Sequence, residues 1–158
     1  MQMDFFYLTT RKEEERLTCL AIVDCSSVGV HSCALPSKGA ESGYAVEFIL
    51  HALADFGYRD IVLHTDGEPA IVSLVNKVKE KRAGRTVPEQ GPRYSHQSQG
   101  HAEQGVKAVE GQTRTPLHAV AQKTGLEFCT KDAIVAWAVR HAGFLITNYR
   151  VLENGRSS

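Results

Sequence analysis

Three acidic residues stand out by their positions, because each lies where a carboxylate could do chemistry. Asp4 lies in an apolar stretch near the start of the chain, on the face that Phe6 and Leu8 would share in a strand. Asp66 directly follows the apolar segment "IVLHT", and Glu103 lies at the start of a long amphipathic pattern. If the segments that carry them are neighbours in space, the three carboxylates can converge.

A convergent set of carboxylates needs a cation. Two unit charges about 4 Å apart repel by roughly 4 kcal/mol at an effective dielectric constant near 20. Oxygen ligands without thiols or imidazoles favour Mg²⁺ or Mn²⁺ over zinc. The three acidic residues therefore predict a site for hard divalent cations, and none of the histidines is assigned to a metal.

Each acidic residue also has an ordinary explanation when it is taken alone. Asp4 could be a carboxylate at a frayed strand end, and Asp66 could be the N-cap of a helix that begins near Gly67. Glu103 could merely complement the dipole of its helix. Asp24 lies at another expected strand end, and we interpret it as a turn residue.

The composition is that of an ordinary globular chain. Its 158 residues suit one domain, spanning 1–158. Lys and Arg together number 18, as do Asp and Glu, so no overall basic field favours a polyanionic partner, although a local patch could still bind one. No apolar run has the length of a membrane span, and no secretory signal segment opens the chain.

The four cysteines show neither a CxxC pair nor zinc-finger spacing. If residues 26–29 form a hairpin turn, Cys33 pairs near Ile22 and its thiol does not meet that of Cys25. We therefore expect reduced cysteines in an intracellular protein.

Apolar periodicity predicts an α/β fold. Three segments at the start of the chain are expected to form an antiparallel meander, followed by strands in "DIVLHT" and in "GRTVPEQ", where Pro88 would confine the strand to a sheet edge. Helices are expected over residues 42–56, 68–81 and 131–150, and residues 89–101 are typical of a surface loop. These elements predict a mixed sheet with helices on both sides.

A further long helix is expected from Ala102, since apolar or small residues recur along one helical face up to Val120. Pro116 should interrupt it, with Thr115 as the N-cap of a second helical piece. The strand before Asp66 should run parallel to an earlier strand, and its carboxyl end is where open α/β sheets place their ligands.

Three segments resemble the signature segments of the catalytic core of retroviral and LTR-retrotransposon integrases: "QMDFFYL", "LHTDGEPA" and "YSHQSQGHAEQ". That family is marked by two aspartates and a glutamate, with about thirty-five residues between the last two. Here thirty-six residues separate Asp66 from Glu103. The segment "AWAVRHAGFLITNYR" is also similar to the last core helix of some retroelement polyproteins, so the resemblance covers almost the whole chain.

The resemblance implies a ribonuclease H-like α/β fold with a five-stranded mixed sheet flanked by helices. It also implies DNA integration by metal-dependent polynucleotidyl transfer, in which the chain trims the 3′ ends of the element and joins them to target DNA. Asp4, Asp66 and Glu103 would be the catalytic residues and would bind two Mg²⁺ or Mn²⁺ ions.

The partners implied by the resemblance are the DNA ends of the element and the target DNA. Tyr94, Gln99 and Lys107 match family positions that contact DNA. The family also implies a homodimer or higher oligomer, no membrane, and a place in the nucleus or in a retroelement particle. The family's zinc-binding module and basic carboxy-terminal domain have no counterpart here, as expected of an excised core or of a fragment of a longer polyprotein.

The sequence departs from the family pattern at three positions. Gly67 replaces the usual Asn, His96 replaces the usual Pro, and Glu110 stands where some retroviral members have a basic residue. Two other functions remain open: a ribonuclease H-like nuclease, and a degenerate, non-catalytic nucleic-acid-binding domain.

Two further features have two interpretations each. The basic run 77–85 is typical of a solvated helix end, although it could also follow a phosphate backbone. The apolar last helix, with Trp137, could be core or could bury a dimer contact.

Overall fold

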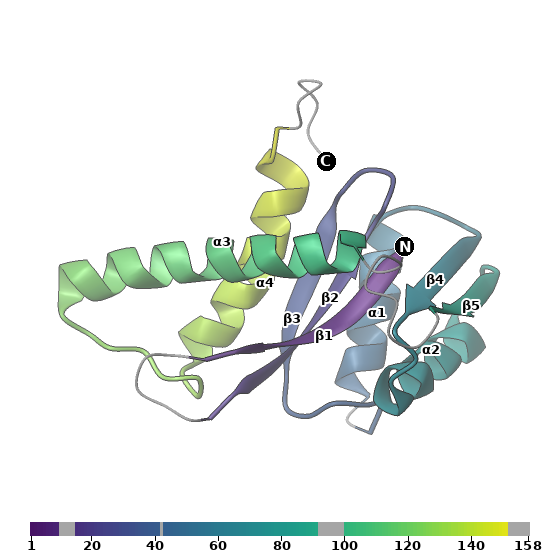
Figure 1. Ribbon diagram of the computed structural model, residues 1–158, viewed down its shortest axis with the longest axis horizontal. Coiled ribbons are helices and arrows are strands. Elements are labelled where there is room, and N and C mark those ends of the chain that lie inside the picture. Colours follow the sequence, from purple (N-terminus) through teal and green to yellow (C-terminus); the bar gives the residue numbers. More distant parts are fainter. Residues whose placement is uncertain (10–14, 42, 92–99, 152–158) are drawn as a thin grey trace.

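The structure is a computed structural model of the chain, and it describes residues 1–9, 15–41, 43–91 and 100–151. Within these residues, five strands form one sheet in the order β3-β2-β1-β4-β5 (Figure 1). In chain order the elements are β1 (Gln2–Leu8), β2 (Leu17–Val23), β3 (Val30–Leu35), α1 (Tyr44–Asp55), β4 (Ile61–Thr65), α2 (Pro69–Lys81), β5 (Thr86–Gln90), α3 (Gly100–Thr124) and α4 (Ala133–Tyr149).

The sheet is mixed, as the sequence predicts. β1, β2 and β3 form an antiparallel meander, whereas β4 pairs in parallel with both β1 and β5. β5 carries Pro88 and lies at the sheet edge, where a residue without a backbone N–H is tolerated.

Alternate residues of β1 contribute to two separate hydrophobic clusters. Met3 and Phe5 belong to the cluster that α1 and α2 cover, and Phe6 and Leu8 belong to the one that α3 and α4 cover. This alternation follows from the two-residue period of a strand. Helices therefore cover both faces of the sheet, and the middle strands are apolar on both sides.

The ends of the helices follow local sequence signals. α1 ends beside Gly57, whose φ of 77° is in the left-handed region that glycine adopts at little cost. α2 begins at Pro69, because a first-turn residue needs no backbone N–H. Among the described residues, no helix combines the length and apolarity required to cross a membrane.

The prediction that Pro116 interrupts the long helix is wrong. α3 is continuous from Gly100 to Thr124 with Pro116 inside it. Thr115 is not an N-cap, and its hydroxyl instead donates to the backbone oxygen of Gly111 at 3.0 Å. Pro116 has no backbone N–H to donate to the preceding turn of the helix. The hydroxyl of the adjacent Thr115 supplies a hydrogen bond to that same turn.

The hairpin between β2 and β3 differs in register from the prediction. Its connection runs from Asp24 to Gly29, closed by a bond from the Asp24 N–H to the Gly29 oxygen at 2.9 Å. Cys33 lies opposite Leu20 rather than near Ile22. The longer turn forms because the Asp24 side chain organises it, and all four cysteines are free.

Candidate active site

Asp4 and Asp66 lie level with each other on neighbouring strands. The parallel pairing of β1 with β4 places Gln2 opposite His64, and the His64 N–H donates to the Met1 oxygen at 2.9 Å. Asp4 follows Gln2 by two residues, and Asp66 follows His64 by two residues, in the same direction along the sheet. The adjacency of these strands, on which the convergence of the two carboxylates depends, is therefore confirmed.

The electrostatics of Asp4 reflect this placement. Its pKa is raised from 3.8 to about 6, first because the carboxyl is partly buried and then because of the negative charge of Asp66. Glu68 adds to the rise, whereas a backbone hydrogen bond from Phe5 and the ammonium of Lys38 oppose it. The ionised form of Asp4 is thus disfavoured by its surroundings, and a cation between the two aspartates would relieve this.

Asp66 is exposed at the carboxyl end of β4. Its Oδ1 accepts the backbone N–H of Glu68 at 2.9 Å, and Glu68 rather than Asp66 is the N-cap position of α2. The carboxylate of Asp66 therefore shapes the turn before α2. The alternative explanation, in which Asp66 is the N-cap of this helix, is wrong. One oxygen of Asp66 accepts that bond, and the negative charge of the same carboxylate raises the pKa of Asp4.

The structure accounts for the glycine at position 67. Gly67 has a φ of 79°, in the left-handed region, where glycine is favoured and asparagine is tolerated better than most other residues. Gly67 therefore fits the backbone conformation of the turn that follows Asp66.

Glu68, whose backbone is bonded to Asp66, forms an ion pair with Lys38, and the sequence analysis did not identify this pair. Lys38, in the connection between β3 and α1, donates from Nζ to both oxygens of Glu68 at 2.7 and 2.8 Å. Its ammonium also lies 5.1 Å from the ring centroids of Phe5 and Tyr7. No periodic or motif signal relates Lys38 to Glu68, because the two lie thirty residues apart in polar connections.

Glu103 lies in the first turn of α3, and that turn is attached to the start of β1. The backbone N–H of Ala102 donates to Oε1 of Gln2 at 2.8 Å. Figure 1 shows this end of α3 beside the N-terminus. Among the described residues, however, no three His, Cys, Asp or Glu side chains lie together as a metal-binding group. The structure places Asp4 and Asp66 on neighbouring segments of the sheet, and their convergence with Glu103 on one metal site stays a prediction.

The expected DNA contacts are only partly described. Lys107 is exposed on α3, one turn after Glu103. Tyr94 and Gln99 lie outside the described residues. In the basic run 77–85, the ammonium of Lys81 lies 2.7 Å from Glu47, and Lys77 donates to the Ala40 oxygen at 3.4 Å. These internal contacts agree with a helix end packed on α1.

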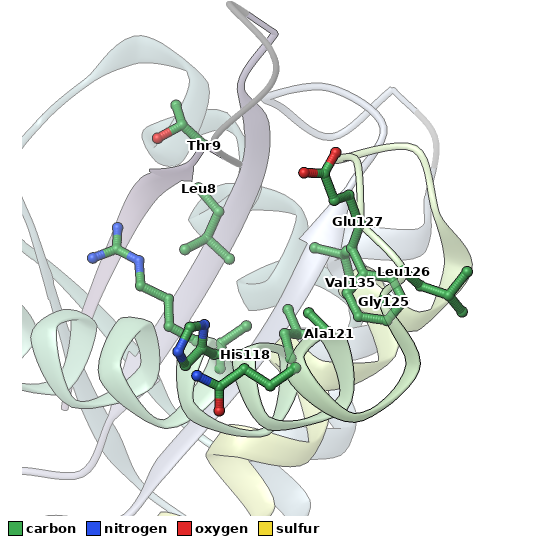
Figure 2. Close-up of a pocket in the computed structure, with 13 residues that line it drawn as sticks. Leu8, Thr9, His118, Ala121, Gly125, Leu126, Glu127 and Val135 are labelled. Carbon is green, nitrogen blue, oxygen red and sulfur yellow. The ribbon is translucent and has the colours of Figure 1, made fainter.

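A groove of about 770 Å³ lies at the other end of β1 from Asp4. Figure 2 shows Leu8 on one side of it and His118 and Ala121 on the other, where the second half of α3 passes. Gly125, Leu126 and Glu127 lie where the chain turns after α3. Since neither aspartate lines this groove, it is separate from the carboxylate pair.

The donor chemistry of the aspartate pair fits a hard divalent cation. Asp4 and Asp66 offer carboxylate oxygens, and Mg²⁺ is often bound by one or two carboxylates together with phosphate oxygens of the substrate. Burial and the nearby charge of Asp66 both raise the pKa of Asp4, so its ionised form would be favoured by a bound cation. The two residues could therefore hold Mg²⁺ or Mn²⁺, with Glu103 as the expected third ligand.

No protein family model and no curated protein sequence matches the chain. Solved structures do. One is the simian T-cell lymphotropic virus intasome in complex with PP2A regulatory subunit B56 gamma, with 19% identity and a TM-score of 0.69 over 99% of this chain and 51% of that chain. The catalytic core domain of BIV integrase has 19% identity and a TM-score of 0.63 over 99% and 89%. The HTLV-2 integrase catalytic core domain, in complex with magnesium, has 14% identity and a TM-score of 0.67 over 99% and 90%.

These similarities concern the fold. The chain has the ribonuclease H-like fold of retroviral integrase cores, with a five-stranded mixed sheet and flanking helices, and this prediction is confirmed. The chain spans about half the length of the matched chain in the intasome structure. The resemblance seen in the sequence motifs and the similarity of the structures thus point to the same family of folds.

Proposed function

We propose that residues 1–158 are the catalytic core domain of a retroelement integrase, which carries out DNA integration by metal-dependent polynucleotidyl transfer. The observation that carries this proposal is the level placement of Asp4 and Asp66 at neighbouring strands of an integrase-like fold. Asp4, Asp66 and Glu103 are its proposed catalytic residues, and the reactions are 3′-end processing and strand transfer.

The carboxylates of Asp4 and Asp66 would bind the divalent cations of the site. When bound, two Mg²⁺ or Mn²⁺ ions would supply activation of the attacking oxygen and stabilisation of charge on the scissile phosphate. Asp4 and Asp66 would orient the site from the sheet, and the bond between Ala102 and Gln2, which attaches the first turn of α3 to the start of β1, supports a place for Glu103 beside them. Glu103 on that turn would complete the ligand set.

DNA is the proposed partner, as element ends and as target. Lys107 is exposed one helical turn from Glu103, where an ammonium could bind a backbone phosphate. Tyr94 and Gln99 are proposed to contact the element ends. The site of action would be the nucleus or a retroelement particle.

We also propose a homodimer or higher oligomer. On α4, the rings of Trp137 and His141 stack with centroids 4.6 Å apart, and His141 stacks on Phe144 at 6.0 Å. Trp137 is 57% exposed and Phe144 49%, which is unusual for large apolar side chains that face only water. The HTLV-2 core is described as trimeric, which supports an assembly of copies.

A model integration intermediate tests the proposal. In Mn²⁺, the chain should resolve a branched DNA that imitates the product of strand transfer, since this reversal needs only the core. Asp66→Asn and Glu103→Gln should lower the rate by about 100-fold or more, because each removes a cation ligand. Asp60→Asn is the matched control: that exposed carboxylate accepts a bond from the Arg85 N–H at 3.1 Å, at the start of β4 and away from Asp4 and Asp66.

The outcomes separate the alternatives. Cleavage of RNA in an RNA–DNA hybrid, with no action on branched DNA, would favour the ribonuclease H-like nuclease. DNA binding without any cleavage in Mn²⁺ would favour the degenerate binding domain. Efficient strand transfer by this chain alone would contradict the expectation that the flanking domains of an integrase are needed for it.

A further inference from the structure

The first turn of α3 is held by the sheet. Ala102 is fully buried, and its N–H is among the first four of the helix, which have no acceptor within the helix itself. The acceptor is Oε1 of Gln2 in β1, at 2.8 Å and a hundred residues away in the sequence. A strand thus supplies an acceptor that a helix N-terminus commonly receives from its own N-cap residue.

A second contact restrains the same part of α3. Gly105 follows Ala102 by three residues, so the two lie on one face of the helix. A Cβ atom at Gly105 would lie 2.5 Å from Cγ2 of Val23, so a side chain there would push the helix away from β2. Gln2 and Val23 are directly opposite each other in the pairing of β1 with β2. This cross-strand pair contacts one helix face at two points, which restrains both the distance of the first turn from the sheet and its rotation.

Gln2 shares a face of β1 with Asp4. The two residues are two positions apart, and alternate residues of a strand point to the same side. Phe6, two positions further, belongs to the hydrophobic cluster that α3 and α4 cover. One face of β1 therefore carries both a proposed cation ligand and the acceptor for the helix that bears Glu103. Because Glu103 directly follows Ala102, its place depends on the bond to Gln2.

We propose that Gln2 is a positioning residue, whose side-chain oxygen holds the first turn of α3 and so fixes the carboxylate of Glu103 beside Asp4 and Asp66. This inference rests on the proposed function, because it presumes that Glu103 is the third cation ligand. It assigns Gln2 an effect that is exerted through Glu103, without contact between Gln2 and the cation.

The bond itself is tested without metal. In Gln2→Leu, the hydrogen-exchange rate of the Ala102 amide, measured by NMR, should rise about fivefold, because its acceptor is lost. Gln2→Asn has the same amide one carbon shorter and should behave like Gln2→Leu. Gln2→Glu keeps an acceptor with the same reach and should leave the rate within about twofold of the parent.

Mn²⁺ binding tests the effect on Glu103. The free Mn²⁺ signal in electron paramagnetic resonance gives the dissociation constant for Mn²⁺ alone, without DNA and without activity. Gln2→Leu and Gln2→Asn should raise this constant about tenfold, as expected when a group that orients a ligand is removed. Gln2→Glu should not raise it. In a Glu103→Gln background, Gln2→Leu should change the constant by less than about twofold, because no carboxylate is left to position.

Asp132 provides the matched control. Its Oδ2 accepts the N–H of Cys129, also at 2.8 Å, in the turn that precedes α4. Figure 1 shows the connection between α3 and α4 at the opposite end of α3 from the N-terminus of the chain. Asp132→Leu should therefore change the Mn²⁺ dissociation constant by less than about twofold. Thermal unfolding in a chelator shows whether each variant is folded.

Three results overturn the inference, and they separate it from the proposed function. If Asp66→Asn weakens Mn²⁺ binding and Gln2→Leu does not, Gln2 does not position Glu103, and the cation site stands. If Gln2→Leu weakens binding by the same factor with and without the Glu103 carboxylate, its effect does not pass through Glu103. If Asp66→Asn and Glu103→Gln both leave Mn²⁺ binding unchanged, the ion is not at this site, and the proposed function fails together with the inference.

Discussion

Two aspartates of the sheet region, Asp24 just after β2 and Asp4 within β1, are accommodated in opposite ways. Asp24 is only 3% exposed, and its carboxylate accepts the N–H groups of Ser26 and Ser27 and the hydroxyl of Tyr58 at 3.1–3.2 Å. Burial alone would raise its pKa, but these bonds hold the pKa below the usual value. Asp4 has like charges beside it, and its pKa is raised to about 6.

The difference separates a structural carboxylate from one that is available for chemistry. Fixed N–H and O–H donors stabilise the charge of Asp24, and these bonds hold the turn between β2 and β3 and link it to Tyr58, after α1. The charge of Asp4 is compensated only in part, which is costly unless a cation binds. The chain thus maintains at Asp4 a repulsion that it avoids at Asp24.

The largest expected effect is at the structural carboxylate. Asp24→Asn should lower the free energy of unfolding by about 2–4 kcal/mol, because one charge and several of its hydrogen bonds are lost in a buried place. Urea denaturation measures this. Asp60→Asn, at an exposed carboxylate, should cost less than about 1 kcal/mol. Equal losses of stability at Asp24 and Asp60 would show that the hydrogen bonds of Asp24 contribute no special stabilisation.

The pH dependence should be opposite at the two sites. The folded chain binds a proton at Asp4 more tightly than the unfolded chain, so the parent loses stability relative to Asp4→Asn as the pH rises from about 4 to about 6. The loss should reach about 1–3 kcal/mol above that window. The lowered pKa of Asp24 gives the reverse sign: its stabilisation is present above pH 4 and is lost as the pH falls below.

Urea denaturation in the presence of a chelator, at a series of pH values, measures the contributions of Asp4 and Asp24 to the free energy of unfolding. A stability difference between the parent and Asp4→Asn that does not change between pH 4 and 7 would mean that Asp4 is not under repulsion.

The smallest effect concerns the neighbour of Asp4. Asp66→Asn keeps the acceptor for the Glu68 N–H and removes one charge. In a chelator the variant should be as stable as the parent or more stable, by roughly 0.5–2 kcal/mol. Mg²⁺ should raise the melting temperature of the parent and raise that of the variant much less. Equal shifts with Mg²⁺ would show that the two aspartates share no metal site.

Much of this arrangement can be predicted from the sequence, since it follows from local patterns. The parallel strand before Asp66, the edge position of Pro88 and the helix ended by Gly57 each depend on a few adjacent residues. Once β1 and β4 are taken as neighbours, the closeness of Asp4 and Asp66 follows.

Features that depend on tertiary packing were missed. Lys38 and Glu68 meet because two separate connections end at the same place, and Tyr58 reaches Asp24 from across the fold. Pro116 was expected to break α3, but the helix continues, with the Thr115 hydroxyl supplying a local bond. Local rules describe what a segment prefers, and they do not include the neighbours that change the outcome.

The most direct test of the central claim is the anomalous scattering of a crystal of this chain soaked in Mn²⁺. The account predicts a peak about 2.0–2.3 Å from carboxylate oxygens of both Asp4 and Asp66, with Glu103 drawn toward it as a third ligand. Ordered side chains of Asp4 and Asp66 with no Mn²⁺ peak between them would contradict the claim that this pair is a cation site.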